Sequence, residues 1–313
     1  MARPLGKATR QAYGDALLEV GELYPNAVVL DGDLSKSTMT KGFAAKYPER
    51  FFNMGIAEAN MAGVAAGMST AGKIPFASSF ACFLMSKGYD QLRLAVAYSE
   101  SNVKIVTTHS GISIGEDGVS QMSVEDVAQA VALPGFVVMV PCDQYETRQA
   151  ILAAAKYEGP VYIRTGRVNA PLVYDAPPED FEIGKSITVR EGTDVTVIAN
   201  GLMVPAALDA ADALAEKGVS VRVIDMHTVK PLDEEAVKEA AEETKGIVVA
   251  EEHLTTGALG AMVAQAAGRL HPTRMEFVGV EDTFAESGTP AGVMEKYGLT
   301  ANGVAAAIDR VLA

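Results

Sequence analysis

Short apolar runs alternate with amphipathic stretches along most of this chain, and this alternation restricts the possible folds more than any other feature. The strand-like runs of the first half lie at 27–30, 103–108, 136–140 and 161–164. Helix-like segments separate them, including a long one at 80–98. Alternating strands and helices form parallel sheets that are covered on both faces, so we predict an α/β fold. Ligands of such folds bind at the carboxyl ends of the strands.

A proline-rich, acidic stretch without periodicity, NAPLVYDAPPEDFEIG, interrupts the alternation. Such a stretch is typical of a linker or a long crossing loop. Alternation then resumes near residue 185. We therefore predict two domains, at residues 1–170 and 187–313, joined by a linker at 171–186. Each domain is expected to be a mostly parallel sheet with helices on both faces.

Composition excludes several classes of protein. The net charge is −14 and no Lys/Arg run occurs, which argues against a nucleic-acid partner. No apolar run is long enough to cross a membrane, and the first residues lack the apolar core of a signal peptide. The two cysteines, Cys82 and Cys142, lie in apolar surroundings and are expected to be buried free thiols. We therefore expect a cytoplasmic protein.

The first stretch with chemical potential is VVLDGDLSKSTMT at residues 28–40. It places Asp31 and Asp33 just beyond a strand and follows them with hydroxyl groups, including that of Ser37. Carboxylates and hydroxyls at a strand end can bind a ligand. The alternative is a turn that caps a helix, because Asp, Gly and Ser favour both structures.

The second stretch is RFFNMGIAEANMAGVAAGM at residues 50–68, where Glu58 lies in a helix of small apolar residues. Burying a carboxylate in such surroundings is unfavourable unless a partner binds it, and burial raises its pKa. Both properties suit proton exchange with a heterocycle. The alternative places Glu58 at the exposed edge of a buried helix.

The third stretch is THSGISIGEDGVSQM at residues 108–122. A strand delivers His109 into a glycine-rich loop that also carries Asp117 and Gln121, a set suited to proton transfer and hydroxyl binding. The alternative is an ordinary long loop. No second His or Cys lies at ligand spacing, so we expect no metal site, and the glycines fit neither nucleotide-binding fingerprint. Arg164 and Arg167, after the next strand, could bind a phosphate or form a surface ion pair.

These stretches, in this order, resemble the transketolase family. Further matching segments are SSFACFLM, PCDQYET, YIRTGR and VIDMHTVKPLD, so the resemblance covers essentially the whole chain. It implies a pyrimidine-binding domain followed by the family's C-terminal domain. It also implies transfer of a two-carbon ketol unit between phosphorylated ketose and aldose sugars, with thiamine diphosphate as the cofactor.

The resemblance also assigns roles to residues. Glu58 matches the glutamate that protonates the aminopyrimidine ring, which leads to the ylid, and it is the expected catalytic residue together with His109. Phe80 and Phe83 match aromatic residues that stack on this ring, and Asp33 matches an acidic residue close to the cofactor. The residues implied to bind substrate are Arg10, Ser37, His109, Asp117, Gln121 and Arg167.

Three features depart from the family pattern. Gln121 replaces a histidine of many microbial and plant members, and Ser86 lies where some relatives have a third aromatic residue. Full-length members also begin with a domain that holds the diphosphate through Mg²⁺, using a GDG motif and a downstream Asn that have no counterpart here. We therefore expect a split transketolase, in which an N-terminal subunit holds Mg²⁺ and shares the cofactor with a homodimeric core in a heterotetramer.

Two alternatives to a split transketolase stay open at this point. The first is the beta subunit of a two-oxo-acid dehydrogenase, which usually has a GGxxHSQ segment where this chain has GEDGVSQM. The second is a non-catalytic homologue that stabilises a partner. The presence of both Glu58 and His109 disfavours the second alternative.

Overall fold

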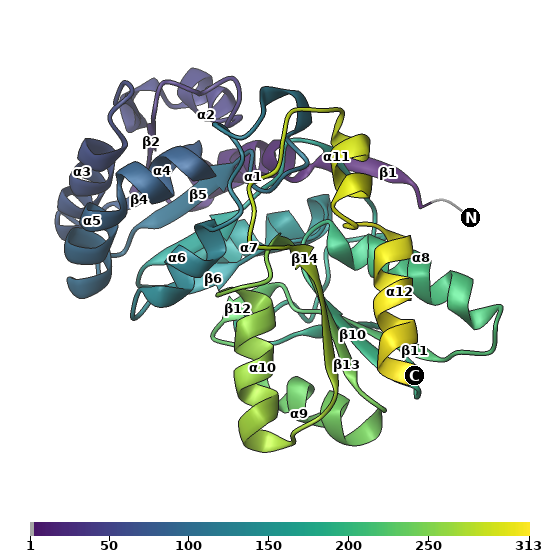
Figure 1. Cartoon of the computed structure of the whole chain (residues 1–313). Coiled ribbons are helices and arrows are strands. Elements are labelled where there is room, and N and C mark those ends of the chain that lie inside the picture. The colour runs from purple at the N-terminus through teal and green to yellow at the C-terminus, as the bar shows by residue number, and fades with distance from the viewer. Residues whose placement is uncertain (1–2) are drawn as a thin grey trace.

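Two sheets form the framework of the protein, one above the other in Figure 1. The computed structural model describes residues 3–313. The larger sheet consists of β2 (Ala27–Asp31), β3 (Phe51–Asn53), β4 (Ile74–Phe80), β5 (Lys104–Thr108), β6 (Val137–Met139), β7 (Val161–Arg164) and β12 (Thr228–Lys230). Its strand order is β12-β6-β7-β5-β4-β2-β3, and all neighbours are parallel except the pair β12–β6.

The smaller sheet lies in the second half of the chain. Its strands are β9 (Ile187–Arg190), β10 (Val195–Ala199), β11 (Val221–Asp225), β13 (Ile247–Leu254) and β14 (Met275–Val280), in the order β14-β13-β10-β11-β9. Only β9 runs antiparallel to its neighbour. Two short strands, β1 (Leu5–Ala8) and β8 (Asn169–Pro171), form a separate antiparallel pair.

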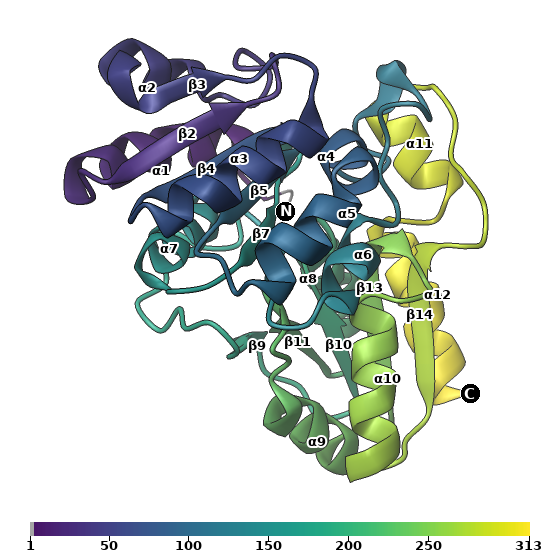
Figure 2. The same cartoon turned by 90° about the vertical axis from the view of Figure 1, so that its left-hand side faces the viewer.

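Helices cover both faces of the larger sheet, as Figure 2 shows. One face packs on α1 (Thr9–Leu23) and α7 (Gln144–Lys156) through an apolar core that includes Leu17, Phe76 and Ile151. The other face packs on α3 (Glu58–Thr70), α4 (Ala81–Lys87) and α6 (Asp126–Ala132). Shorter elements are α2 (Lys41–Lys46), η1 (Pro48–Arg50), α5 (Tyr89–Gln91), the π-helix η2 (Leu92–Tyr98) and η3 (Gly115–Asp117).

The smaller sheet is covered in the same way. Helices α8 (Met203–Ala215) and α12 (Ala301–Leu312) pack on one face, and α9 (Glu234–Glu243) and α10 (Leu259–Leu270) pack on the other. Helix α11 (Pro290–Lys296) lies apart from them, beside the larger sheet's half in Figure 1. The predicted α/β fold, with parallel sheets covered on both faces, is therefore confirmed. None of the helices within residues 3–313 has both the length and the apolar surface to span a bilayer.

The main error of the sequence reading lies at residues 74–80. The helix expected at 80–98 is present as α4, α5 and η2 from Ala81 on, but the sequence reading missed β4, a fully buried strand between β2 and β5 that ends at Phe80. Its sequence, IPFASSF, contains residues of low strand propensity. Burial on both faces of a central strand favours small side chains, so tertiary packing outweighs local preference here.

The two halves of the chain interlock. Strand β12 comes from the second half but pairs with β6 of the larger sheet. Conversely, Ile112, Ile114, Met122 and Val124 from the first half belong to the apolar core around the smaller sheet. Contacts of this kind tie the glycine-rich loop that follows His109 to the second half.

A fully buried acidic cluster also lies where the two halves meet. The Cys142 thiol and the Tyr174 hydroxyl donate to Asp225 Oδ2 over 3.2 and 2.9 Å, and the Cys142 amide donates to Glu146 over 2.6 Å. Burial and the nearby Asp225 charge raise the pKa of Glu146, and burial raises the pKa of Asp225 to about 6. Cys142 is a buried free thiol as expected, whereas Cys82 is only partly buried.

These raised pKa values predict a pH-dependent stability. At a pH above the ordinary carboxyl pKa, the unfolded chain releases protons that the folded protein retains. The free energy of unfolding therefore falls as pH rises from the ordinary carboxyl pKa through the raised pKa values of the folded state. Glu146→Gln stays neutral and can donate to Asp225. We expect it to be more stable than the parent protein at pH 8 by about 1–3 kcal/mol, with no advantage near pH 4.5.

Urea unfolding of Glu146→Gln and the parent at several pH values measures this effect. The exposed Glu239 offers a matched control, because Glu239→Gln makes the same Glu-to-Gln change in the formal charge of the sequence, but outside the cluster. If the free energy of unfolding depends on pH equally in the parent and in Glu146→Gln, the folded cluster does not retain a proton on Glu146.

Candidate active site

Glu58 is the first residue of α3, and only 2% of its surface is exposed. Its Oε2 lies 3.6 Å from the Lys87 ammonium, and Oε1 has no hydrogen-bond partner among the described residues. The helix N-terminus favours a carboxylate here, because the first backbone amides point toward it. The sequence left open whether this carboxylate is buried, and the structure places it inside with one oxygen free for a ligand.

An aromatic row leads from Glu58 to His109. The Lys87 ammonium lies 4.6 Å from the centre of the Phe83 ring. Phe83 stacks on Phe80 with ring centres 5.5 Å apart, and Phe80 stacks on the His109 imidazole at 3.8 Å. Phe80 ends β4 and His109 follows β5, so the carboxyl ends of two neighbouring strands bring these side chains together. This is the edge where the fold predicted a ligand.

The hydrogen bonds of His109 define its protonation. Nδ1 lies 2.8 Å from Thr108 Oγ1, and Nε2 lies 3.4 Å from Arg10 Nη1. Because a guanidinium only donates, Nε2 is assigned as the acceptor and Nδ1 as the nitrogen that carries hydrogen. Burial, and then the charges of Arg10 and Arg167, lower the pKa of His109 to about 3. The imidazole is therefore neutral at physiological pH and accepts hydrogen bonds at Nε2.

Positive charge gathers next to this imidazole. Arg10 Nη1 donates to the Ser37 carbonyl over 2.8 Å, so Ser37 contributes its backbone to this contact. Arg167 Nη1 donates to the Ile114 carbonyl over 2.6 Å and to Glu116 over 3.0 Å. The Arg10 amide donates to the Gly166 carbonyl over 3.3 Å, so the backbone of Arg10 lies beside that of Arg167, and burial and the charge of Arg167 lower the pKa of Arg10.

The remaining predicted residues lie on loops around this row. Asp117 is the last residue of η3, on the same loop as Glu116. Asp33 has φ 66° and accepts from Asn53 Nδ2 over 2.8 Å. The Gln121 carbonyl accepts from the Cys82 thiol over 3.2 Å, which ties the glycine-rich loop to α4.

Asp31 is a structural residue. Its buried carboxylate accepts from the Leu34 amide over 2.6 Å and from the Thr38 and Thr40 hydroxyls over 2.6 and 2.9 Å. These contacts fold the loop that carries Ser37. For Asp31, the turn alternative of the sequence reading is therefore correct.

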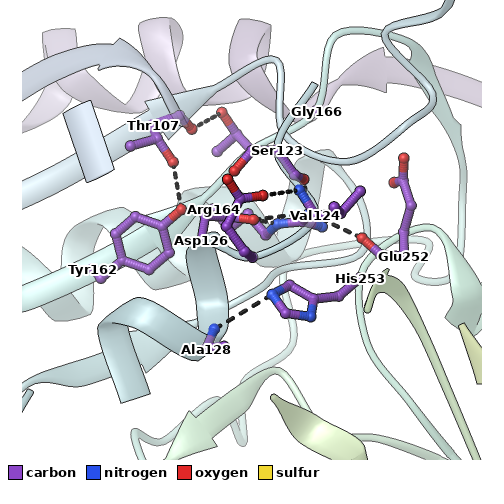
Figure 3. A network of polar contacts seen from close by, with 12 residues as sticks. Thr107, Ser123, Val124, Asp126, Ala128, Tyr162, Arg164, Gly166, Glu252 and His253 are labelled. Atoms are coloured by element: carbon purple, nitrogen blue, oxygen red, sulfur yellow. Dashed lines mark hydrogen bonds and ion pairs between the residues drawn. The ribbon is translucent and has the colours of Figure 1, made fainter. Parts of the chain in front are cut away.

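Arg164 cannot bind a phosphate in this structure, and it is not a surface residue either. Figure 3 shows its guanidinium between Asp126 and the Glu252 carbonyl. Its Nε and Nη2 donate to the two Asp126 oxygens over 2.8 and 3.2 Å, and the pair is buried. Of the two arginines that the sequence singled out, only Arg167 is accessible to a ligand.

Sequence reasoning missed Lys87, which connects Glu58 to the aromatic row. The one signal was its position directly after Ser86, where the third aromatic residue of some relatives is lacking. A cation at this point pairs with the buried carboxylate and lies over an aromatic face.

Comparison with known proteins identifies the family. The model described as the transketolase pyrimidine-binding domain matches residues 6–172, and that of the transketolase C-terminal domain matches residues 184–304. A putative transketolase C-terminal section from Methanocaldococcus jannaschii is 44% identical over 302 residues, covering 96% of this chain and 94% of that protein. The chain belongs to the transketolase family.

Several transketolase relatives are of similar length. A 6-deoxy-6-sulfo-D-fructose transketolase subunit of a Clostridium species is 41% identical, covering 96% of this chain and 94% of that protein. A solved split-gene transketolase, described as an inactive β4 tetramer, is 47% identical with a TM-score of 0.90, covering 98% of each chain. By contrast, this transketolase chain covers 48% of human transketolase, to which it is 37% identical.

Proposed function

We propose that this chain is the C-terminal subunit of a split transketolase that acts in the cytoplasm. It would transfer a two-carbon ketol unit between sugar phosphates, including those of pentose phosphate metabolism, once an N-terminal subunit joins it. The observation that carries the proposal is the continuous row from Glu58 through Phe83 and Phe80 to His109 and Arg10. This row combines a buried carboxylate, a stacked aromatic pair, a neutral imidazole and cations.

The row fits the pyrimidine half of thiamine diphosphate, the cofactor on which this family depends. A flat heteroaromatic ring can stack on Phe83, which is partly buried, and Glu58 Oε1 has no partner in the described structure. An unpartnered buried carboxylate oxygen is costly unless a ligand satisfies it. When bound, the cofactor supplies a stabilised carbanion that carries the two-carbon unit.

The chain's own residues then hold the ring, the proton and the sugar. Glu58 holds or releases a proton at Oε1, where its carboxylate faces the proposed ring. Phe80 and Phe83 restrict the ring orientation and exclude water from this carboxylate. Neutral His109 would accept a hydrogen bond from a sugar hydroxyl at Nε2 when that hydroxyl replaces the 3.4 Å contact with Arg10, and Asp33, Asp117 and Gln121 lie on loops at the same edge.

Phosphate would bind at Arg10 and Arg167. The Arg10 guanidinium lies next to His109, and within residues 3–313 the Arg167 guanidinium contacts only the Ile114 carbonyl and the exposed Glu116. A substrate phosphate can replace the weak, solvent-exposed Glu116 contact and accept charge-assisted hydrogen bonds instead. Two relatives are named for a sulfonated and a phosphorylated sugar, and both of these sugars are anionic.

Arg167→Ala tests the phosphate site. We expect KM for phosphorylated sugars to rise about 10- to 150-fold, because a hydrogen bond to a charged group contributes about 1.5–3 kcal/mol. KM for the unphosphorylated analogues should change little. Steady-state kinetics of the reconstituted enzyme measure both values.

The matched control for Arg167→Ala is Glu116→Gln. It removes the carboxylate that pairs with Arg167, so KM for phosphorylated sugars should stay unchanged or fall. Equal losses on phosphorylated and unphosphorylated substrates in Arg167→Ala would show that Arg167 holds the loop rather than phosphate.

Exposed apolar side chains just before α3 and on the neighbouring η2 support a partner at this face. Ile56 and Tyr98 are 79% and 85% exposed, and Leu94 is also exposed. They belong to the segment before α3 and to η2, which packs against α3. Large exposed apolar groups mark interaction surfaces. We propose that a second copy and the N-terminal subunit cover this face, giving a homodimeric core in a heterotetramer.

The decisive experiment is reconstitution of turnover. The chain is mixed with the N-terminal subunit from the same cell, thiamine diphosphate and Mg²⁺, and two-carbon transfer between a ketose phosphate and an aldose phosphate is followed. Turnover that requires both chains supports the proposal. Decarboxylation of a two-oxo acid would support the dehydrogenase alternative, and binding without any turnover would support a stabilising homologue.

A further inference from the structure

We propose that the C-terminal half positions His109, and that Glu252 on β13 is the positioning residue. This inference rests on the proposed function only where turnover is concerned. The structural part concerns the loop 110–118, which carries the chain from His109 to Gly118. His109, just before this loop, has φ 58°, and within the loop Gly111, Gly115 and Gly118 have φ values of 77°, 77° and 79°.

The Glu252 carboxylate lies directly under this loop. Its side chain is buried, and Oε1 accepts a hydrogen bond from the Ser113 amide over 2.6 Å. A Cβ atom added at Gly111 would lie 2.1 Å from the same oxygen, so only glycine fits against the carboxylate. Glu252 therefore contacts the loop both two and four residues after His109.

The rest of the loop also packs against the second half of the chain. Ile112 and Ile114 are fully buried in the core around the smaller sheet. Cβ atoms added at Gly115 and Gly118 would lie 2.7 Å from Pro290 and 2.3 Å from Ser287. The loop thus packs closely against the second half at Ile112, Ile114, Gly115 and Gly118.

Arg164 anchors this arrangement from below (Figure 3). Its Nη2 donates to the Ser123 carbonyl over 3.1 Å and to the Glu252 carbonyl over 2.9 Å. Ser123 in turn accepts from the Gly111 amide over 2.8 Å. The buried Arg164–Asp126 pair therefore fixes the backbone of Glu252 and of Ser123, and both hold Gly111.

This scaffold matters for His109 because its backbone is strained. A non-glycine residue with positive φ persists only where its surroundings enforce it. The imidazole stacks on Phe80 and faces Arg10, so a small rotation of the backbone would misalign both contacts. A displacement of about 1 Å can lower a rate by about 100-fold. The C-terminal half would thus contribute to the active site without touching the substrate.

The test compares Glu252→Ala with Glu251→Ala. Glu251 is the preceding residue of β13, is equally buried, and also accepts backbone amides, those of Leu259 and Gly260 at the start of α10. Both variants remove a buried carboxylate from the same strand, but only Glu252 contacts the loop. Glu252→Gln keeps an acceptor for Ser113 and should restore the parent behaviour.

Two measurements are made below the melting transition of every variant. Hydrogen exchange of the lone chain should be at least about tenfold faster across 110–118 in Glu252→Ala, and unchanged there in Glu251→Ala. In the reconstituted enzyme, kcat should fall about 100-fold in Glu252→Ala and stay close to the parent value in Glu251→Ala and Glu252→Gln.

Gly111→Ala tests the contact from the loop side, so the proposal remains testable if Glu252→Ala does not fold. It should reproduce both the faster exchange and the lower kcat. Unchanged exchange across 110–118 in Glu252→Ala or Gly111→Ala, or equal effects of Glu251→Ala and Glu252→Ala, would overturn the positioning role. If the parent protein shows no sugar turnover, the proposed function fails, whereas the exchange measurement still decides whether Glu252 holds the loop.

Discussion

Glu58→Gln is expected to lower turnover of the reconstituted enzyme by about 10²–10⁴-fold, the usual effect of losing a general acid or base. Glutamine has the same shape but cannot release a proton at the proposed ring. The subunit should stay folded, because Oε1 has no partner to lose among the described residues and Lys87 is half-exposed, so its ammonium stays hydrated when the charge of residue 58 is removed. The direct measurement is exchange of the cofactor's thiazolium proton in the complex.

The control for Glu58→Gln is Glu49→Gln, which neutralises an exposed carboxylate elsewhere in the same half. It should leave both proton exchange and turnover at the parent level, and circular dichroism should show the same fold in all three proteins. A thiazolium exchange rate in Glu58→Gln equal to that of the parent would remove Glu58 from this role.

The isolated chain is expected to show no sugar turnover and to bind thiamine diphosphate at least about 100-fold more weakly than the complex. The proposed pyrimidine site contributes aromatic stacking and one carboxylate contact. Most of the cofactor's charge lies on the diphosphate, which favours helix N-termini and Mg²⁺, and we propose that the partner supplies these. Two lost charge-assisted contacts would account for a difference of this size.

Calorimetric titration with thiamine diphosphate and Mg²⁺, with and without the N-terminal subunit, measures this difference. The matched control is a complex that contains Glu58→Gln, which should keep the diphosphate contacts and lose only part of the affinity. Sedimentation of the lone chain should show self-association through its apolar face, since obligate interfaces often exceed about 2,000 Å². Micromolar binding together with sugar turnover by the lone chain would refute the split-enzyme proposal.

Local sequence patterns were sufficient for most elements of the fold. The run VYIR was predicted as a strand at 161–164, and β7 has these same bounds. Apolar periodicity marks such buried strands because both faces pack against helices. The pattern failed for β4, where Ala and Ser replace the usual branched residues. It also could not indicate that β12 crosses to the other sheet, because pairing partners depend on the whole topology.

The sequence indicated candidate site residues where a polar or ionisable side chain was unusual among its neighbours. Glu58 stood out among small apolar residues, and His109 stood out at a strand end in a glycine-rich loop. Arg164 and Arg167 looked equivalent in the sequence, yet the structure pairs Arg164 with buried Asp126 and leaves Arg167 on the loop after His109, where it donates to the Ile114 carbonyl. Sequence spacing cannot separate two such residues, since their partners come from distant segments.

The sequence by itself determined the α/β class, the strand ends that carry polar side chains, and the family. These features depend on local periodicity and on residue types, which a single chain displays directly. Only the tertiary structure decided that Lys87 pairs with Glu58, that Phe80 stacks on His109, and that Glu252 lies under the loop after His109. Each of these contacts joins residues from separate elements, and their geometry exists only once the sheets and their covering helices have packed together.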